Sequence, residues 1–474
     1  MSTTSTLTND ITEIGDLVSL RASVRGTLLT PDDAGYDATR ALWNGMIDKR
    51  PALILQCTTT DDVIAGLAFA RVHDLEIAVR GGGHNVAGSA SCDGGLVLGL
   101  APMNDVRVDP HRRRAVAGGG ATIGDVDRAT VPHGFAAPLG VVSETGIAGL
   151  TLGGGMGWMR RKHGLACDAL RSVEVVTADG RVLRASTEEN EDLFWAMRGG
   201  GGNFGVVTRF EFELYPVEPE VFMLATFYPV EAAHEVFDFV QDWGTDAPDE
   251  IAPIAVVGHI PEAEFFPAEH HGKPMVALVG PWIGDVEAGA EALASLRTIA
   301  EPLADLSGPM PYLDVQQFFD ADYPSGGRYY WKAQNLRTLD ERAVEDLVLF
   351  NASTPSHHTT LDVWLGGGAA ARTPAEATAF GDRSTAYGFT VEANWHDPAD
   401  DEANVAWARE CFEVMQRLSA GSSYLNFPGF SEEGETAVQA AHGPNYARLQ
   451  AIKRAYDPEN VFRTHQNVVP AEVA

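Results

Sequence analysis

The chain has 474 residues, of which 45% are hydrophobic and 21% are charged, so it can form the cores of two or three globular domains. This composition excludes wholesale disorder, and no run of about 18 apolar residues could form a membrane-spanning helix. The formal charge of −32, from 66 acidic and 34 basic residues, disfavours nucleic acid and anionic membranes as partners.

The acidic residues are spread along the whole chain, and lysine occurs only five times. Such a surface is typical of a protein that stays soluble in high salt, where charge repulsion is screened. The sequence therefore predicts a halophilic host and unfolding in dilute buffer. The N-terminus has neither a basic segment nor an apolar one, which predicts no secretory signal and a cytoplasmic location.

The four cysteines are Cys57, Cys92, Cys167 and Cys411. None belongs to a C-x-x-C pair, and no histidine lies at metal-ligand spacing beside them. We therefore expect reduced, partly buried thiols and no metal site.

The first 215 residues contain short α/β elements. Two acidic residues after Thr60 predict the first turn of a helix that runs to about His73, and Thr122 is a suitable N-cap for a second helix that ends near Thr130. Strict alternation at 206–214 predicts a half-buried antiparallel strand. We expect further strands at 52–56, 75–79, 96–100, 106–109, 113–117 and 170–177, a hairpin turn at 179–180 and a short helix at 188–197.

A domain boundary is expected at 215–219, where two prolines occur. Beyond it, predicted strands at 221–228, 275–279, 361–364 and 389–395 are interspersed with predicted helices at 232–243, 286–299, 340–352 and 404–418. This order predicts one antiparallel sheet backed by helices. A last helix is expected at 444–456, before a polar C-terminal segment.

Glycine is common, with 49 residues, and it clusters in runs at 81–83, 118–120, 153–155, 199–202 and 366–368. Backbone without a Cβ atom can approach an extended ligand and offer N–H groups to phosphate oxygens. The alternative, that these runs are only turns, stays open on the glycines alone.

One segment, Gly200–Gly205, matches G-x-G-x-x-G. A Rossmann site needs a strand before this motif and a helix after it. Here a predicted helix precedes the motif and a predicted strand follows, so we reject a Rossmann fold. A pyrophosphate, if bound, must be held by the loops of a different fold.

Six segments in order resemble the FAD-linked oxidases of the vanillyl-alcohol-oxidase type, in the berberine-bridge-enzyme-like branch. The first, Arg80-Gly81-Gly82-Gly83-His84-Asn85, resembles the R-x-G-G-H signature. The others lie at 116–127, 145–164, 198–208, 424–427 and 446–467, and the match is weak between 220 and 410. The resemblance implies an α+β protein with a PCMH-type FAD-binding domain of two α/β sub-domains and an antiparallel-sheet substrate domain backed by helices.

The same resemblance implies the domain limits. The FAD-binding domain is expected at 1–215, with its PCMH-type core at about 47–216. The substrate-binding domain is expected at 216–439, and a C-terminal segment at 440–474 is expected to return to the FAD domain.

In this family the signature histidine is bonded through a ring nitrogen to the 8α carbon of the flavin, so the resemblance implies a covalent link at His84. Such a link raises the reduction potential and prevents loss of the cofactor. Some members add a bond from a cysteine, but Val142 stands at that place, so we expect a single link to FAD. The other residues implied to bind FAD are Arg80, Gly81, Gly82, Gly83, Asn85, Val86, Gly88, Gly140, Val142, Ser143, Gly146, Ala148, Gly149, Gly153, Gly157, Val206 and Asn467.

The resemblance makes Tyr424 the candidate catalytic base. A tyrosine with an ordinary pKa of about 10 is a poor base at neutral pH, so a neighbour that the sequence does not identify must lower the pKa. The alternative, a core tyrosine whose hydroxyl is merely satisfied, stays open. Segments 329–332 and 362–364 are expected near the substrate, with aromatic core packing as their alternative.

The implied reaction is oxidation of a carbon that bears a hydroxyl or an amine, by hydride transfer to FAD, with O₂ as the expected acceptor. The candidate substrates are a sugar, a secondary alcohol or a small heterocyclic amine. Two alternatives remain: a dehydrogenase that uses another electron acceptor, and a flavin-binding protein without turnover.

Overall fold

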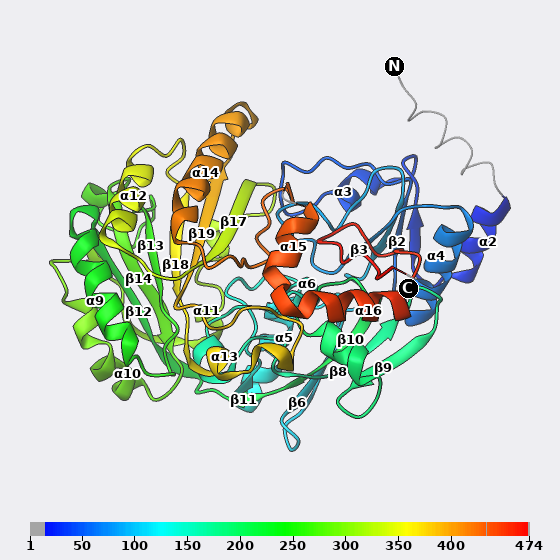
Figure 1. Cartoon of the computed structure of the whole chain (residues 1–474), viewed down its shortest axis with the longest axis horizontal. Helices are drawn as coiled ribbons and strands as arrows, with labels where there is room; N and C mark the ends of the chain where they lie inside the picture. The colour runs from blue at the N-terminus through cyan, green and yellow to red at the C-terminus, as the bar shows by residue number, and fades with distance from the viewer. Residues whose placement is uncertain (1–14, 433, 473–474) are drawn as a thin grey trace.

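The computed structural model describes residues 15–432 and 434–472, which form two packed halves (Figure 1). The two-sheet half contains two small sheets and a separate two-stranded pair of residues 135–136 with 215–216, all built before residue 217, together with the C-terminal helices. The large-sheet half contains one large sheet, built from residues 220–395, and the helices that cover it. The α+β fold class expected from the sequence is confirmed. None of the helices in the described ranges is long and apolar enough to cross a membrane.

The first small sheet has the strand order β1-β2-β4-β3, in which β2, β4 and β3 are parallel and β1 is antiparallel to β2. Its parallel strands are apolar because helices α2 and α4 cover one face, while α3 packs on the other. The elements are α2 (Gly15–Ser23), β1 (Thr27–Leu29), α3 (Tyr36–Arg40), β2 (Leu53–Gln56), α4 (Thr60–Val72), β3 (Ile77–Arg80) and β4 (Leu96–Gly99).

The second small sheet is antiparallel, with the order β5-β6-β10-β8-β9. The predicted alternation of the central strand β10 is confirmed, because Phe210 and Phe212 are fully buried while Arg209 and Glu211 are only half-buried. The elements are β5 (Val106–Asp109), β6 (Arg114–Gly118), α5 (Ile123–Thr130), β7 (Phe135–Ala136), α6 (Ile147–Leu152), α7 (Arg160–His163), β8 (Leu170–Val176), β9 (Val182–Ser186), α8 (Glu191–Met197), β10 (Val206–Glu213) and β11 (Tyr215–Pro216).

The N-termini of α4 and α5 are set by the local sequence. Thr59 accepts a hydrogen bond from the Asp62 N–H, and the Asp62 carboxylate accepts one from the Thr59 N–H, which forms a capping box. Thr122 and Asp125 repeat this arrangement, so the N-cap predicted at Thr122 is confirmed.

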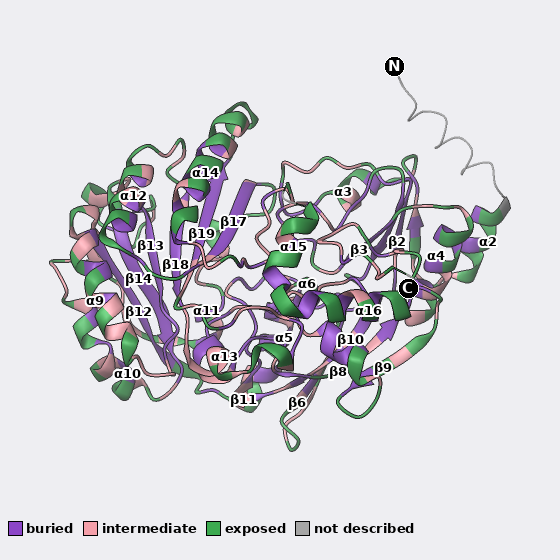
Figure 2. Cartoon of the chain, viewed as in Figure 1, coloured by how far each residue is buried: buried purple, intermediate pink, exposed green. Residues whose placement is uncertain are grey.

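The large sheet has the order β15-β12-β14-β13-β18-β19-β17, with β16 paired to β12. Helices α9, α10, α12 and α14 cover its outer face, and the strands under these helices are buried (Figures 1 and 2). The elements are β12 (Glu220–Pro229), α9 (Ala233–Thr245), β13 (Ile254–His259), β14 (Pro274–Trp282), α10 (Val286–Ala292), β15 (Ala304–Asp305), β16 (Gly308–Pro311), α11 (Tyr312–Val315), β17 (Arg328–Leu336), α12 (Glu341–Ala352), β18 (Thr360–Leu365), α13 (Gly368–Arg372), β19 (Tyr387–Trp395) and α14 (Asp401–Met415).

Four strands of this sheet are absent from the strands expected from the sequence: the short edge strands β15 and β16, and the two longer strands β13 and β17. The short ones offer too few residues for a pattern, and the longer ones have another reason. Both are buried on both faces, so their sequences show no polar–apolar alternation. The helix expected at 286–299 ends at Ala292, and a 3-10 turn at Ala294–Arg297 follows it.

The C-terminal helices α15 (Gly434–His442) and α16 (Tyr446–Tyr456) lie on the two-sheet half (Figure 1). Val438, Leu449 and Ile452 are buried in the same apolar cluster as Phe210 and Phe212. The segment 366–386 between β18 and β19 also crosses to this half, where the side chains of Trp195 and Arg198 donate to the carbonyls of residues 376 and 377. The domain limits expected from the sequence stay a prediction.

Candidate active site

One cavity lies between the two halves, and glycine-rich loops form most of its lining. The segment after β3, the segment around α6, the loop before β10 and the C-terminal segment all reach it, while the large sheet contributes two tryptophans. The lining includes residues 81–85, 140–142, 145–146, 148–150, 199–202, 424–427, 462 and 464–466, with Trp331 and Trp364. Segments that are distant in the sequence therefore meet around one space.

Most of the residues predicted to bind FAD line this cavity. They are Gly81, Gly82, Gly83, His84, Asn85, Gly140, Val142, Gly146, Ala148, Gly149 and Gly153. Arg80, Val86, Gly88, Ser143, Gly157 and Val206 are outside the lining. Asn467 lines a second cavity, which adjoins the first at Tyr424, Leu425, Phe427, His465 and Gln466.

Several of the predicted residues outside the lining fasten the loops that form it. The Arg80 guanidinium donates to the carbonyls of Thr39 (2.5 Å) and Ala90 (3.2 Å), so it holds the loop that carries His84. The N–H and hydroxyl of Ser143 both donate to the Asp320 carboxylate, at 2.8 and 2.5 Å, and so tie the segment of Val142 to the large-sheet half. Val206 is a core residue of β10.

The glycines of the lining meet two different needs. At Gly82 a Cβ atom would lie 2.5 Å from the backbone nitrogen of Gly146, so the two loops can cross only without side chains. At Gly149 a Cβ atom would meet nothing within 4 Å, because this glycine faces the open cavity. The first glycine permits the fold of the site, and the second leaves room for a ligand.

His84 is held against the cavity by a stack of rings. Its imidazole lies 3.9 Å from the Trp43 ring at 18°, and Trp43 lies 3.8 Å from the Tyr329 ring at 5°. The Nε2 atom is buried without a hydrogen-bond partner among the described residues. Burial lowers the pKa of His84 to about 4, so the imidazole is neutral at physiological pH and keeps a nucleophilic nitrogen.

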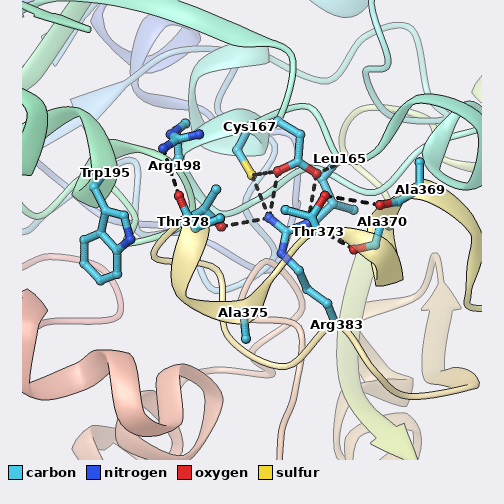
Figure 3. A network of polar contacts seen from close by, with 12 residues as sticks. Leu165, Cys167, Trp195, Arg198, Ala369, Ala370, Thr373, Ala375, Thr378 and Arg383 are labelled. Atoms are coloured by element: carbon cyan, nitrogen blue, oxygen red, sulfur yellow. Dashed lines mark hydrogen bonds and ion pairs between the residues drawn. The ribbon is translucent and has the colours of Figure 1, made fainter. Parts of the chain in front are cut away.

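Val142 lines the cavity with His84 and packs against Trp43, Tyr329 and Trp331. All four cysteines are buried, and none is in the lining of this cavity. Cys167 lies beside Asp168 and Arg383 in a polar network that joins the two halves (Figure 3). The Arg383 guanidinium donates to both oxygens of Asp168, at 2.7 and 2.8 Å.

Tyr424 lies at the wall between the two cavities. Its hydroxyl oxygen accepts hydrogen bonds from Nδ2 of Asn426 at 2.8 Å and from the backbone N–H of Met156 at 3.2 Å. Burial raises the pKa of Tyr424, and these two bonds offset that effect only in part. The neighbours that favour the phenolate are thus Asn426 and Met156, but in this site the hydroxyl keeps its proton at neutral pH.

The large sheet presents aromatic side chains to the cavity. Of the two segments expected near the substrate, Trp331 and Trp364 line the cavity. Tyr330 belongs to the core on the opposite, helix-covered face, since neighbouring residues of a strand point to opposite sides. Asp362 does not line the cavity, and burial beside Glu392 holds its pKa well above the usual range.

Residues that sequence reasoning missed include His442, His465 and Gln466, which all line the cavity. His465 and Gln466 lie in a segment that the family resemblance covers, so the resemblance was the available signal. His442 ends α15, where nothing in the sequence distinguishes it from a surface residue. Burial and the nearby Lys453 cation lower the pKa of His465 to about 4, so this ring is neutral as well.

The lining of the cavity contains no charged side chain in the described part of the chain, although the protein carries a net charge of −32. No aspartate or glutamate would repel a bound diphosphate. The glycine loops leave backbone N–H groups as donors for such an anion.

FAD fits the residues that are present. Its diphosphate suits a lining that is uncharged and rich in glycine, and Gly149 faces open space. Apolar side chains in the lining, such as Ile77 and Leu100, suit an aromatic base. His84 also lines the cavity, and its imidazole is neutral.

Comparisons with known proteins agree with this site. Residues 51–186 match the family described as an FAD binding domain, and residues 423–469 match the family described as berberine and berberine like. The chain is 32% identical to (R)-6-hydroxynicotine oxidase of Paenarthrobacter nicotinovorans, over 94% of this chain and 97% of that protein. It is 28% identical to an uncharacterised FAD-linked oxidoreductase of Bacillus subtilis, over 95% and 98%. The crystal structure of 6-hydroxy-D-nicotine oxidase from Arthrobacter nicotinovorans has a TM-score of 0.84 to this chain, with 31% identity and coverage of 95% and 99%.

Proposed function

Because the chain belongs to the berberine-bridge-like family of FAD-linked oxidoreductases, we propose that it is an oxidase of a small heterocyclic amine. When bound, FAD accepts a hydride from the carbon next to the amine nitrogen. We further propose that O₂ is the final acceptor and that His84 alone links the cofactor covalently. The expectation of an FAD-linked oxidoreductase is confirmed. The substrate, the electron acceptor and the covalent link to His84 are what we propose.

The choice of an amine as substrate rests on the hydrogen bonds and the protonation of the Tyr424 hydroxyl. Its oxygen already accepts two N–H bonds, so its O–H is the group left to donate to a substrate. Burial raises its pKa, so it is a weak base at neutral pH. An alcohol must lose its O–H proton as the hydride leaves, which requires a base. An amine needs no such base, because its lone pair stabilises the cation that forms.

The uncharged lining supports the same choice. Without a carboxylate in the cavity wall, a protonated amine would be desolvated with no counter-ion, which is costly. The neutral amine, which is the form that can release a hydride, would therefore be bound in preference. The relative named for 6-hydroxynicotine acts on a compound of this class.

The covalent link rests on the position and charge of His84. A histidine must be neutral to form a bond from its ring nitrogen, and burial keeps the pKa of His84 at about 4. Trp43 fixes the plane of the ring. Val142, an apolar residue, lines the same part of the cavity, so no second bond is expected there.

The test is anaerobic bleaching of the flavin by a panel of heterocyclic amines, secondary alcohols and sugars. We expect a heterocyclic amine to reduce the flavin fastest and peroxide to accumulate when air is the only oxidant. Reduction by sugars alone would contradict the amine proposal. Reduction without peroxide would indicate a dehydrogenase, and bleaching by dithionite but by no organic compound would indicate a flavin-binding protein without turnover.

A further inference from the structure

A fully buried ion pair lies directly behind the glycine-rich wall of the cavity. Lys453 and Asp457 are both completely buried, one turn apart at the end of α16, and Nζ of Lys453 lies 2.6 Å from the Asp457 carboxylate. Burying two charges is costly unless further hydrogen bonds satisfy them. A pair in this position therefore needs a reason beyond stability.

The remaining hydrogen bonds of the Lys453 ammonium go to two carbonyls. Nζ donates to the carbonyl oxygen of Asn203 and to that of Phe462, both at 2.8 Å. The Asp457 carboxylate accepts the backbone N–H groups of Val461 and Phe462, at 2.8 and 2.9 Å. The pair thus binds two backbone segments that are far apart in the sequence, one at residue 203 and one at 461–462.

The side chain of Asn203 extends the same connection. Its Nδ2 donates to the carbonyls of Gly200 (2.8 Å) and Gln466 (3.1 Å), and its Oδ1 accepts the Val468 N–H at 2.9 Å. Gly199–Gly202, Phe462 and residues 464–466 line the cavity, whereas Asn203, Lys453 and Asp457 do not. The network thus holds lining residues in place from outside the lining.

We propose that Lys453 is a positioning residue for the cofactor, which holds the loop 199–203 against the segment 462–468 so that both can bind the diphosphate of FAD. Asp457 balances its charge, so Lys453 acts through its two carbonyl bonds and not by attracting the diphosphate. The inference concerns FAD binding alone and holds whichever substrate is oxidised.

The experiment compares three full-length variants: Lys453→Met, Lys453→Met with Asp457→Asn, and the control Arg454→Met. The double variant leaves no uncompensated charge, and Arg454 is an exposed cation on the same helix. Each protein is incubated with a series of limiting FAD concentrations, and the monodisperse folded fraction is isolated. Total flavin per folded protein is then measured by absorbance, together with the visible circular dichroism of the bound flavin.

At limiting FAD, we expect the folded double variant to incorporate roughly tenfold less flavin than wild type, because two buried carbonyls lose their donor, while the control is unchanged. A residue that only stabilised the fold would reduce the yield of folded protein but not its flavin content. Wild-type flavin content and dichroism in the folded double variant would overturn the proposal. If neither Lys453 variant folds, the flavin content and dichroism of Asn203→Ala test the proposal instead, since this substitution removes the side-chain bonds between the same two segments.

Discussion

The two walls of the cavity differ in whether backbone or side chains face its interior. The two-sheet half meets the ligand with backbone, at glycines such as Gly82, Gly146 and Gly149, whereas the large-sheet half presents the side chains of Trp331 and Trp364. A wall of glycine backbone suits a cofactor of constant shape, because a side chain added at these glycines would take up the space of the cofactor or of the neighbouring loop. A wall of side chains can be changed by single substitutions, which suits the part of the site that selects the substrate.

The largest expected effect is at His84, the one side chain of the backbone wall proposed to react. In His84→Ala, all the flavin should enter the supernatant after acid precipitation, because the only proposed covalent link is gone. Flavin fluorescence of pellet and supernatant measures this. His163→Ala is the control, since His163 stacks on Tyr215 and does not line the cavity. Flavin that stays in the His84→Ala pellet would disprove the link.

Tyr424→Phe tests the side-chain wall. For an amine substrate, anaerobic stopped-flow should show flavin reduction slowed about tenfold, because one orienting hydrogen bond is lost. For an alcohol substrate, the loss of a base should slow it by roughly 10²-fold or more. Tyr228→Phe serves as control, since this buried hydroxyl donates to the Leu296 carbonyl in the core between the large sheet and its helices. An unchanged rate in Tyr424→Phe removes this residue from the reaction.

Two alanine substitutions separate folding from binding within the backbone wall. Gly82→Ala should destabilise the protein by roughly 1–3 kcal/mol, because its Cβ would press on the Gly146 backbone at 2.5 Å. Gly149→Ala should leave the thermal stability of the FAD-free protein unchanged but lower its FAD content, since its Cβ enters open space. Thermal unfolding and flavin absorbance measure the two effects. Equal behaviour of the two variants would contradict this distinction.

The smallest expected effect is a pH dependence at the junction of the two halves. Asp127 of α5 is buried and accepts a bond from Nε2 of Gln316 at 2.9 Å, and burial raises its pKa to about 7. The folded protein thus holds this proton where the unfolded chain has lost it. Its contribution to stability should fall as the pH rises from about 4 to about 7.

Asp127→Asn removes that dependence. The difference obtained by subtracting the Tm of the variant from the Tm of wild type should therefore be lower by a few degrees at pH 8 than at pH 5. Asp314→Asn, at an exposed position of α11, should show no such change. A Tm difference between wild type and Asp127→Asn that does not vary with pH would refute the raised pKa.

The sequence predicted residues of both walls of the cavity, but it did not predict the strand that carries Trp331. Glycine runs and the motif around His84 are local signals, and eleven of the residues predicted to bind FAD line the cavity. Strand β17, which carries Trp331, gave no signal because burial on both faces removes alternation. Asn426 was covered by the resemblance, but its bond to Tyr424 is visible only in the folded chain.

By itself, the sequence determined the family, the two kinds of fold region, the helix cap at Thr122, and the rejection of a Rossmann site, since each depends on the order of neighbouring residues. The predicted cytoplasmic location, halophilic host and roles of the site residues remain predictions. Tertiary structure alone decided the neutrality of His84, the raised pKa of Tyr424 and the contacts of Lys453. Those properties arise from burial and from partners hundreds of residues away, which no local pattern encodes.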